Sequence, residues 1–172
     1  MNYYALQVKT GAEDSYIKRM ASMPLGDDEG SLRLIFPRRR LMVRRKGKNV
    51  SELAPIFPGY IFLETEELSQ DLYWILRTTD GFYRFLPDNV RPLPIGGRDL
   101  ATLKHFTALG DIADRSKVRF DENDRIQVAE GPLKGLEGRI VKVDKRKGRA
   151  KVKLDMYDES FLIDLSFELL SQ

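Results

Sequence analysis

The sequence has 172 residues, of which 42% are hydrophobic and 32% are charged, with no cysteine and a formal net charge of +3. This composition can bury a core and remain in solution, and the lack of cysteine excludes a disulfide framework or a thiolate metal site. No apolar run approaches the roughly 20 residues of a membrane helix, and the amino terminus lacks a signal-peptide pattern. We therefore expect a cytoplasmic protein of one or two small domains, without a membrane association.

The first part of the chain predicts strands and helices in alternation. Residues 3–8 alternate as a strand does. A helix is predicted to start at residues 11–14, where Glu13 and Asp14 favour its first turn, and Pro24 with Gly26 is predicted to stop it. The acidic loop 27–29 is interpreted as a solvated turn, with a cation site as the alternative. A second strand is predicted over 31–37.

A dense basic segment follows. Residues 38–48 contain seven basic side chains and no acidic one, and the stretch 46–49 predicts the tip of a hairpin. One interpretation is an edge hairpin kept soluble by its charge. We favour nucleic-acid contact, because a polyanion relieves the repulsion within such a cluster. A second basic run lies at 145–149. The predicted nucleic-acid contacts are Arg38, Arg39, Arg40, Arg44, Arg45, Lys46, Lys48, Lys145, Arg146, Lys147 and Arg149.

The apolar run 57–63 predicts a central strand that begins after a Pro-Gly turn. An amphipathic helix is predicted over 68–78, an aromatic strand over 82–86 and a short helix over 99–109. This order of elements predicts an α+β fold, in which an amino-terminal α/β sandwich packs helices on a mainly antiparallel sheet.

The character of the sequence changes after this region. Residues 110–121 are polar and aperiodic, and they predict a linker. Beyond them the hydrophobic pattern has period two, and the alternation over 150–156 favours strand over helix. Roughly five short strands in so short a segment predict a small five-stranded β-barrel. The predicted organisation is a domain over 1–109, a linker over 110–121 and a second domain over 122–172.

The chain offers little for catalysis. Its single histidine, His105, has no cysteine partner and is expected at the surface or the edge of the core. Neither a phosphate-binding glycine loop nor a nucleophile paired with a base is recognisable. We expect a binding protein without enzymatic activity, cofactor or metal site.

Three stretches of the first domain, 3–9, 57–62 and 90–94, resemble the amino-terminal (NGN) domain of the NusG family in order and spacing. The segments 124–128 and 131–138 are similar to the KOW motif of the same family, which belongs to an SH3-like barrel. The resemblance covers nearly the whole chain. It implies an NGN-like domain followed by a KOW domain.

The resemblance also implies a function. NusG-type factors dock an apolar face of the first domain on the clamp region of RNA polymerase and suppress pausing and termination. Phe57 and Tyr60 match the polymerase-contacting aromatics of the family, and burial of both in the core is the alternative. The residues predicted to bind RNA polymerase are Tyr3, Tyr4, Phe57, Pro58, Tyr60, Phe62, Phe82 and Phe85.

One turn departs from the general pattern. General NusG factors carry a Phe-Gly-Arg turn that binds Rho or a ribosomal protein, whereas Tyr157, Asp158 and Glu159 stand here. Together with the basic segment, this resembles specialised paralogues of the LoaP type, similar also to RfaH. That resemblance implies a monomeric antitermination factor recruited by nascent RNA, such as a leader hairpin, with DNA as a further candidate partner. A general NusG-type factor that couples polymerase to Rho or the ribosome is the first alternative. A ribosome-associated protein is the second, against which the apolar first domain argues.

Overall fold

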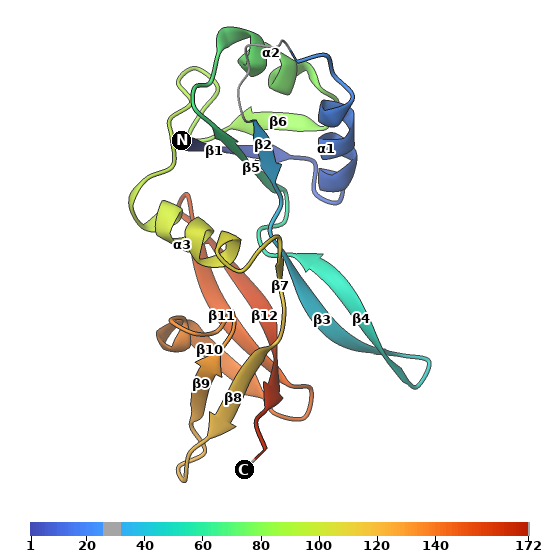
Figure 1. Cartoon of the computed structure of the whole chain (residues 1–172), viewed down its shortest axis with the longest axis vertical. Coiled ribbons are helices and arrows are strands. Elements are labelled where there is room, and N and C mark those ends of the chain that lie inside the picture. The colour runs from blue at the N-terminus through green and yellow to red at the C-terminus, as the bar shows by residue number, and fades with distance from the viewer. Residues whose placement is uncertain (26–31, 172) are drawn as a thin grey trace. The chain divides into compact units, whose positions relative to one another are not determined.

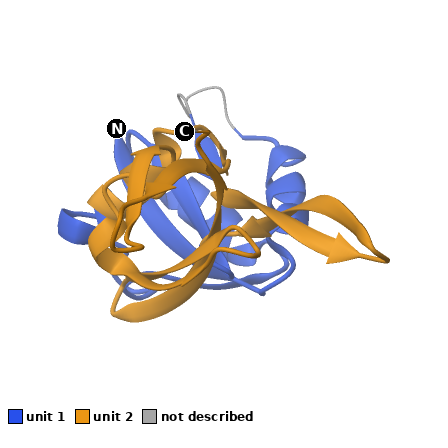
Figure 2. Cartoon of the chain, turned by 90° about the horizontal axis from the view of Figure 1, so that it is seen from below, with its two compact units in different colours: residues 1–36, 57–100 blue, residues 37–56, 101–172 orange. Residues whose placement is uncertain are grey.

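The computed structural model describes residues 1–25 and 32–171. The acidic loop 27–29 lies outside the described residues. The chain divides into two compact units, each discontinuous in sequence (Figure 2). Unit 1 comprises Met1–Phe36 and Phe57–Leu100, and unit 2 comprises Pro37–Ile56 and Ala101–Gln172. Within the described part of the chain, no helix is long and apolar enough to cross a membrane.

Unit 1 is built on a four-stranded sheet with the strand order β2-β5-β1-β6 (Figure 1). Every neighbouring pair in this sheet is antiparallel, which confirms the predicted sheet. Its elements are β1 (Asn2–Val8), α1 (Glu13–Ala21), β2 (Arg33–Ile35), β5 (Tyr60–Thr65), α2 (Gln70–Thr78) and β6 (Phe82–Phe85). The side chain of Ser69 caps α2 by accepting a hydrogen bond from the amide of Leu72 at 3.1 Å.

Helices α1 and α2 pack on one face of this sheet, which we call the helical face. Leu6 of β1 and Ile61 of β5 are fully buried there against Tyr16 of α1 and Leu76 of α2. The Tyr16 hydroxyl donates a hydrogen bond to the Leu76 carbonyl at 2.6 Å, which ties the two helices together. Burial raises the pKa of Tyr16 well above its ordinary value, so this hydroxyl remains a donor.

Successive strand residues point to opposite faces of a sheet. The residues of β1, β2 and β5 that alternate with the helical-face residues therefore form a second face. This second face carries Tyr3, Ala5, Ile35, Tyr60 and Phe62, of which all but Tyr3 are buried.

Unit 2 contains a five-stranded sheet with the order β10-β11-β12-β8-β9, which curls as predicted into a small barrel (Figure 1). Its strands are β8 (Ser116–Phe120), β9 (Ile126–Glu130), β10 (Ile140–Asp144), β11 (Arg149–Met156) and β12 (Glu159–Leu169), with a 3-10 turn η1 (Glu137–Arg139). Along β11 the inward residues Ala150, Val152, Leu154 and Met156 are fully buried. The period-two prediction for this segment is confirmed.

The polar segment 110–121 differs from the predicted linker because it contains β7 (Ile112–Ala113) and β8. In β8, Ser116 and Val118 point inward and have no exposed surface. The Ser116 hydroxyl accepts a hydrogen bond from the amide of Leu133 at 2.9 Å. A buried serine thus occupies a position where hydrophobicity patterns expect an apolar residue, and this conceals the strand.

The predicted basic hairpin is present and forms what we call the arm, β3 (Arg38–Arg45) and β4 (Lys48–Pro55) (Figure 1). Lys46 and Gly47 form its tip with φ values of 48° and 76°, the left-handed geometry of a two-residue hairpin turn. The other edge of β3 pairs in parallel with β7, and β3 also contacts β12. The arm is therefore part of unit 2.

The third helix, α3 (Gly97–Thr107), begins in the residues of unit 1 and continues into those of unit 2. The Nε2 atom of His105 donates to the Pro132 carbonyl, with 2.7 Å between the two atoms. Both residues belong to unit 2. His105 is half-buried and links the helix to the loop after β9, which gives it a structural role.

Candidate functional site

The two basic segments meet at a groove between the arm and the turn 145–148 that joins β10 to β11. This groove has a volume of about 550 Å³ and is lined by Met42, Val43, Arg44, Asn49, Arg146, Lys147 and Arg149. A cavity of about 300 Å³ shares Met42, Asn49, Arg146 and Lys147 with it. No acidic residue lines either of the two. Basic residues that lie about a hundred positions apart in the sequence thus face a common space.

Two of the predicted contacts have structural roles: Arg149 holds the arm to the barrel, and Arg39 joins the two strands of the arm. Arg149 donates from Nη2 to the Met42 carbonyl of β3 at 2.6 Å, and its Nη1 lies 4.0 Å from the Asp164 carboxylate of β12. Arg39 donates to the Pro55 carbonyl across the hairpin. Burial lowers the pKa of Arg39 to about 10, while Asp164 opposes this shift and Arg149 adds to it. Arg39 therefore stays protonated at neutral pH, as an anchor more than as an exposed ligand.

Three further predicted contacts are paired with acidic residues. Arg40 lies 3.5 Å from the Asp114 carboxylate, and Arg45 pairs with Glu52 on the facing strand β4. Lys145 pairs with Asp124 and also lies over the Phe120 ring, 4.1 Å from its centroid. The segment 38–48 contains no acid of its own, but its neighbours in space supply acidic partners. The positive potential of these cations is correspondingly reduced.

The remaining predicted contacts differ in exposure. Arg38 is half-buried in β3, beside β7. The others are exposed and form no ion pair with any described residue: Arg44, Lys46, Lys48, Arg146 and Lys147. Of these, Arg44 on the arm and Arg146 and Lys147 on the turn line the groove. They are the side chains best placed to meet a phosphate.

Asp164, Met42 and Asn49 were not predicted as parts of this site. Asp164 contributes a carboxylate close to Arg149, Met42 contributes a backbone carbonyl, and Asn49 lines the groove. The sequence around each of them does not indicate a place in the site, because contacts with segments distant in sequence position these residues. The pairing of β3 with β4, the hydrogen bond from Arg149 to Met42 and the contact of β3 with β12 bring them together.

Most residues predicted to bind RNA polymerase are buried. Tyr4 and Phe85 belong to the core of the helical face, and Phe57 and Tyr60 are fully or almost fully buried, as in the alternative stated for them. Phe62 is also fully buried, in edge-to-face contact with Phe57 at a centroid distance of 5.7 Å. Half-buried positions are held by Tyr3, Pro58 and Phe82. Polymerase docking by the predicted set stays a prediction.

The turn between β11 and β12 consists of Tyr157 and Asp158, enclosed by the paired residues Met156 and Glu159. Both turn residues have positive φ, 50° and 63°, which is the type I′ geometry that asparagine and glycine favour. Together with Glu159, the first residue of β12, the turn therefore presents a tyrosine and two carboxylates.

A four-stranded antiparallel sheet with two helices in unit 1 and a five-stranded barrel in unit 2 define a protein of the α+β class with two differently folded parts. A family profile described as transcription termination factor nusG matches residues 1–104. The chain belongs to the NusG family, whose members are transcription factors.

Relatives match along almost the whole chain. The NusG proteins of Thermus thermophilus and Haemophilus influenzae are 23% and 25% identical, covering 97% and 96% of this chain and 96% and 90% of their own lengths. The Bacillus subtilis NusG is 23% identical over 96% of this chain and 95% of its own. A solved structure of Thermotoga maritima NusG has a TM-score of 0.54 at 16% identity, covering 96% of this chain and 93% of that one, and shares the fold.

Proposed function

We propose that this NusG-family protein is a cytoplasmic, monomeric antitermination and elongation factor that binds the clamp region of RNA polymerase, suppresses pausing and termination, and is recruited to particular operons by nascent RNA. The observation that carries the recruitment is the acid-free groove with the exposed, unpaired cations Arg44, Arg146 and Lys147. Cations of this kind bind nucleic acid through its phosphates.

Polymerase docking is assigned to the second face of unit 1. Helices α1 and α2 fill only the helical face. On the second face Tyr60 and Phe62 are buried, so Tyr3 is the aromatic side chain that this face offers to a partner. Aromatic side chains beside half-exposed positions such as Tyr3 and Pro58 suit a protein interface. This assignment rests on the relation to the NusG family and on the alternation of the strands.

The β11–β12 turn favours a specialised paralogue over a general factor. It places Tyr157, Asp158 and Glu159 where the general factors are expected to carry Phe-Gly-Arg. A carboxylate in place of a guanidinium reverses the charge offered to a partner. A partner whose surface is complementary to the guanidinium would be repelled by the carboxylate. Binding of Rho or a ribosomal protein through this turn would require a different set of contacts.

A general NusG-type factor is the second candidate. It is favoured by the relatives from Thermus, Haemophilus and Bacillus, which are termination/antitermination proteins and match 97%, 96% and 96% of this chain.

The test is to purify the tagged protein from cells, detect RNA polymerase by immunoblot and sequence the RNA that accompanies it. We expect polymerase to be retained, with RNA enriched from the leaders of a few operons. RNA spread over all transcripts in proportion to their abundance would favour the general factor. Absence of polymerase would contradict both candidates. A Tyr3→Ala variant should retain less polymerase than Tyr83→Ala, which removes an exposed aromatic from β6.

A further inference from the structure

We infer that the arm and the 145–148 turn form one composite groove, which binds a single RNA strand with unpaired bases. They do not act as two separate basic sites. This inference rests on the proposed recruitment by RNA. The sequence shows two basic runs that could each bind a different ligand. The structure gives them a shared cavity with cations on both of its walls.

The first support is mechanical. Arg149, at the start of β11, donates to the Met42 carbonyl in the middle of β3, and the base of β3 is paired with β7. Asp164 of β12 lies 4.0 Å from Arg149, and its charge opposes the lowering of the Arg39 pKa that burial causes. The arm is therefore fastened to the barrel at its base and at Met42. The two walls keep a defined separation, as a site that binds one ligand between them requires.

The second support is electrostatic. Arg44 reaches the groove from the arm and Arg146 and Lys147 reach it from the turn, while no acidic side chain lines it. None of the three forms a salt bridge with a carboxylate of the described residues. Asp144, which does not line the groove, is the carboxylate close to the turn: it accepts a hydrogen bond from the Lys147 amide at 2.9 Å, and the charges of Lys147 and Arg146 help to lower its pKa. Two cationic walls around a concave space raise the local potential above that of either wall alone. A phosphodiester chain that follows the groove can contact both walls.

The third support concerns the bases. Met42 and Val43 line the groove between the cations and are only half-buried. The outer surface of a closed duplex presents phosphates and sugars, to which such apolar side chains add little. Unpaired bases offer an apolar face that these side chains can cover. The groove therefore suits a single strand or the loop of an RNA hairpin.

This arrangement divides the basic residues by role. Arg44, Arg146 and Lys147 contact phosphates. Arg149 is a positioning residue, because its guanidinium holds Met42 and lies near Asp164. The cations nearest to acids, such as Arg45 and Lys145, contribute less.

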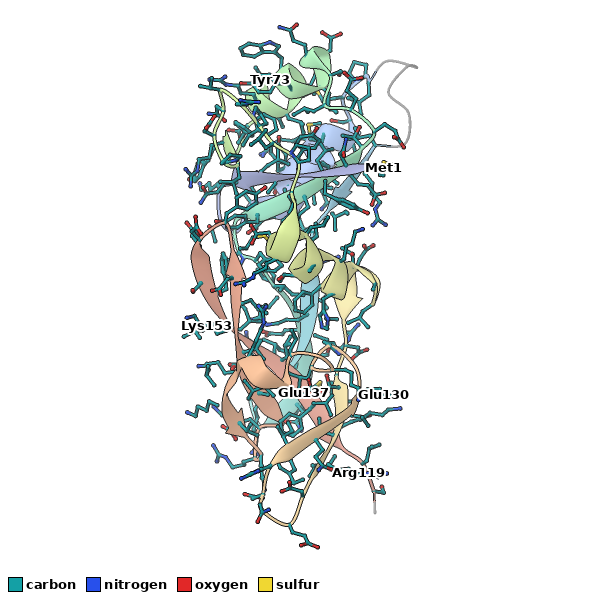
Figure 3. The ribbon with its side chains drawn as sticks, turned by 90° about the vertical axis from the view of Figure 1, so that its left-hand side faces the viewer. Met1, Tyr73, Arg119, Glu130, Glu137 and Lys153 are labelled. Atoms are coloured by element: carbon teal, nitrogen blue, oxygen red, sulfur yellow. The ribbon has the colours of Figure 1, made fainter. Side chains whose placement is uncertain are left out.

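Calorimetry with the full chain and an oligouridylate of about ten nucleotides, a length within the usual range for single-strand grooves, tests the inference. We expect one RNA per protein for the wild type. Arg44→Gln and the pair Arg146→Gln/Lys147→Gln should each keep this stoichiometry and weaken binding by about two- to fivefold per charge. The dependence of log affinity on log salt should flatten by about 0.7 per lost contact. Arg119→Gln removes one charge from an exposed barrel position, as Arg44→Gln does from the groove, and should have little effect (Figure 3).

The opposing outcomes are distinct. Two RNAs per wild-type protein, falling to one in each variant with the remaining affinity unchanged, would establish independent sites and overturn the composite groove while leaving RNA recruitment intact. No binding of RNA by the wild type would overturn both the groove and the recruitment. Equal competition by duplex DNA would overturn the assignment to unpaired RNA.

A charge-conserving variant isolates the positioning role. Arg149→Lys keeps the positive charge at this position but loses the planar guanidinium. That group hydrogen-bonds the Met42 carbonyl and also lies beside the Asp164 carboxylate. We expect RNA affinity to fall by about two- to fivefold, as for the loss of one exposed ion pair, although net charge is unchanged. The circular dichroism spectrum of the barrel should be retained. If Arg149→Lys bound RNA with the affinity of the wild type, the contact between Arg149 and the arm would not contribute to RNA binding.

Discussion

Phe57 is fully buried and packs edge-to-face on Phe62. Truncation of a buried phenylalanine removes its transfer free energy and leaves a cavity, so Phe57→Ala should lower the free energy of unfolding by about 3 to 5 kcal/mol. Tyr83→Ala, at a side chain that is 59% exposed, should change it by no more than about 0.5 kcal/mol. Denaturant titrations of both variants measure this. A Phe57→Ala protein with wild-type stability and weakened polymerase binding would instead make docking the main role of Phe57.

Gly131 has φ of +104°, and a Cβ atom placed there would lie 2.5 Å from the Cα atom of Ser116. Gly131→Ala should therefore lower the free energy of unfolding by about 1 to 3 kcal/mol, through strain and through displacement of β8. Gly138 in the same motif has an ordinary φ and open space around its Cα atom. Gly138→Ala is the matched control and should leave the thermal midpoint nearly unchanged; equal losses in both variants would contradict the close approach.

Single residues show what could be predicted from sequence and what could not. The identities of Phe57 and Tyr60 indicated an aromatic strand, but their burial depends on which residues cover each face of the sheet. The charge of Arg45 could be read from the sequence, whereas its ion pair with Glu52 depends on the register of β3 against β4. Charge density along the sequence therefore overstated the positive potential of the arm.

Strand β8 lies between β12 and β9 in the barrel and pairs with both. A fragment of residues 122–172, which starts at the predicted domain boundary, lacks this strand and exposes two unpaired edges. A fragment of 114–172 includes it. We expect the longer fragment to unfold cooperatively in a thermal melt followed by circular dichroism and the shorter one to show a broad, early transition. Identical melts would show that β8 is dispensable for the barrel.

Elements with a strong hydrophobic period were predictable, and elements defined by their partners were not. The alternation in β11 and the amphipathic pattern of α2, with Ser69 at its cap, identified both from local sequence. β7 is two residues long and exists because β3 offers it a parallel edge. A local pattern cannot report a pairing between residues 38–39 and 112–113.

The proposed polymerase-binding and RNA-binding surfaces lie in different compact units. The second face belongs to unit 1, whereas the groove belongs entirely to unit 2. Neutralising Arg44, Lys46 and Lys48 should thus leave polymerase retention within about twofold of wild type, since independent sites that share no residues behave additively. Co-purification at matched expression levels measures this. A parallel loss of polymerase and RNA would mean that the arm takes part in docking.

The discontinuous composition of unit 2 has a consequence for how the protein is made. The arm leaves the ribosome early, but β7, the turn 145–148 and Asp164 of β12 follow much later in synthesis. During that interval β3 has one edge without its partner, and the groove has only one wall. A nascent chain can therefore complete unit 1, whose last described strand ends at Phe85, long before it can hold RNA in the groove. The capacity to bind RNA through both walls arises only when β12 is in place, so a prematurely ended chain carries the basic arm without an assembled binding site.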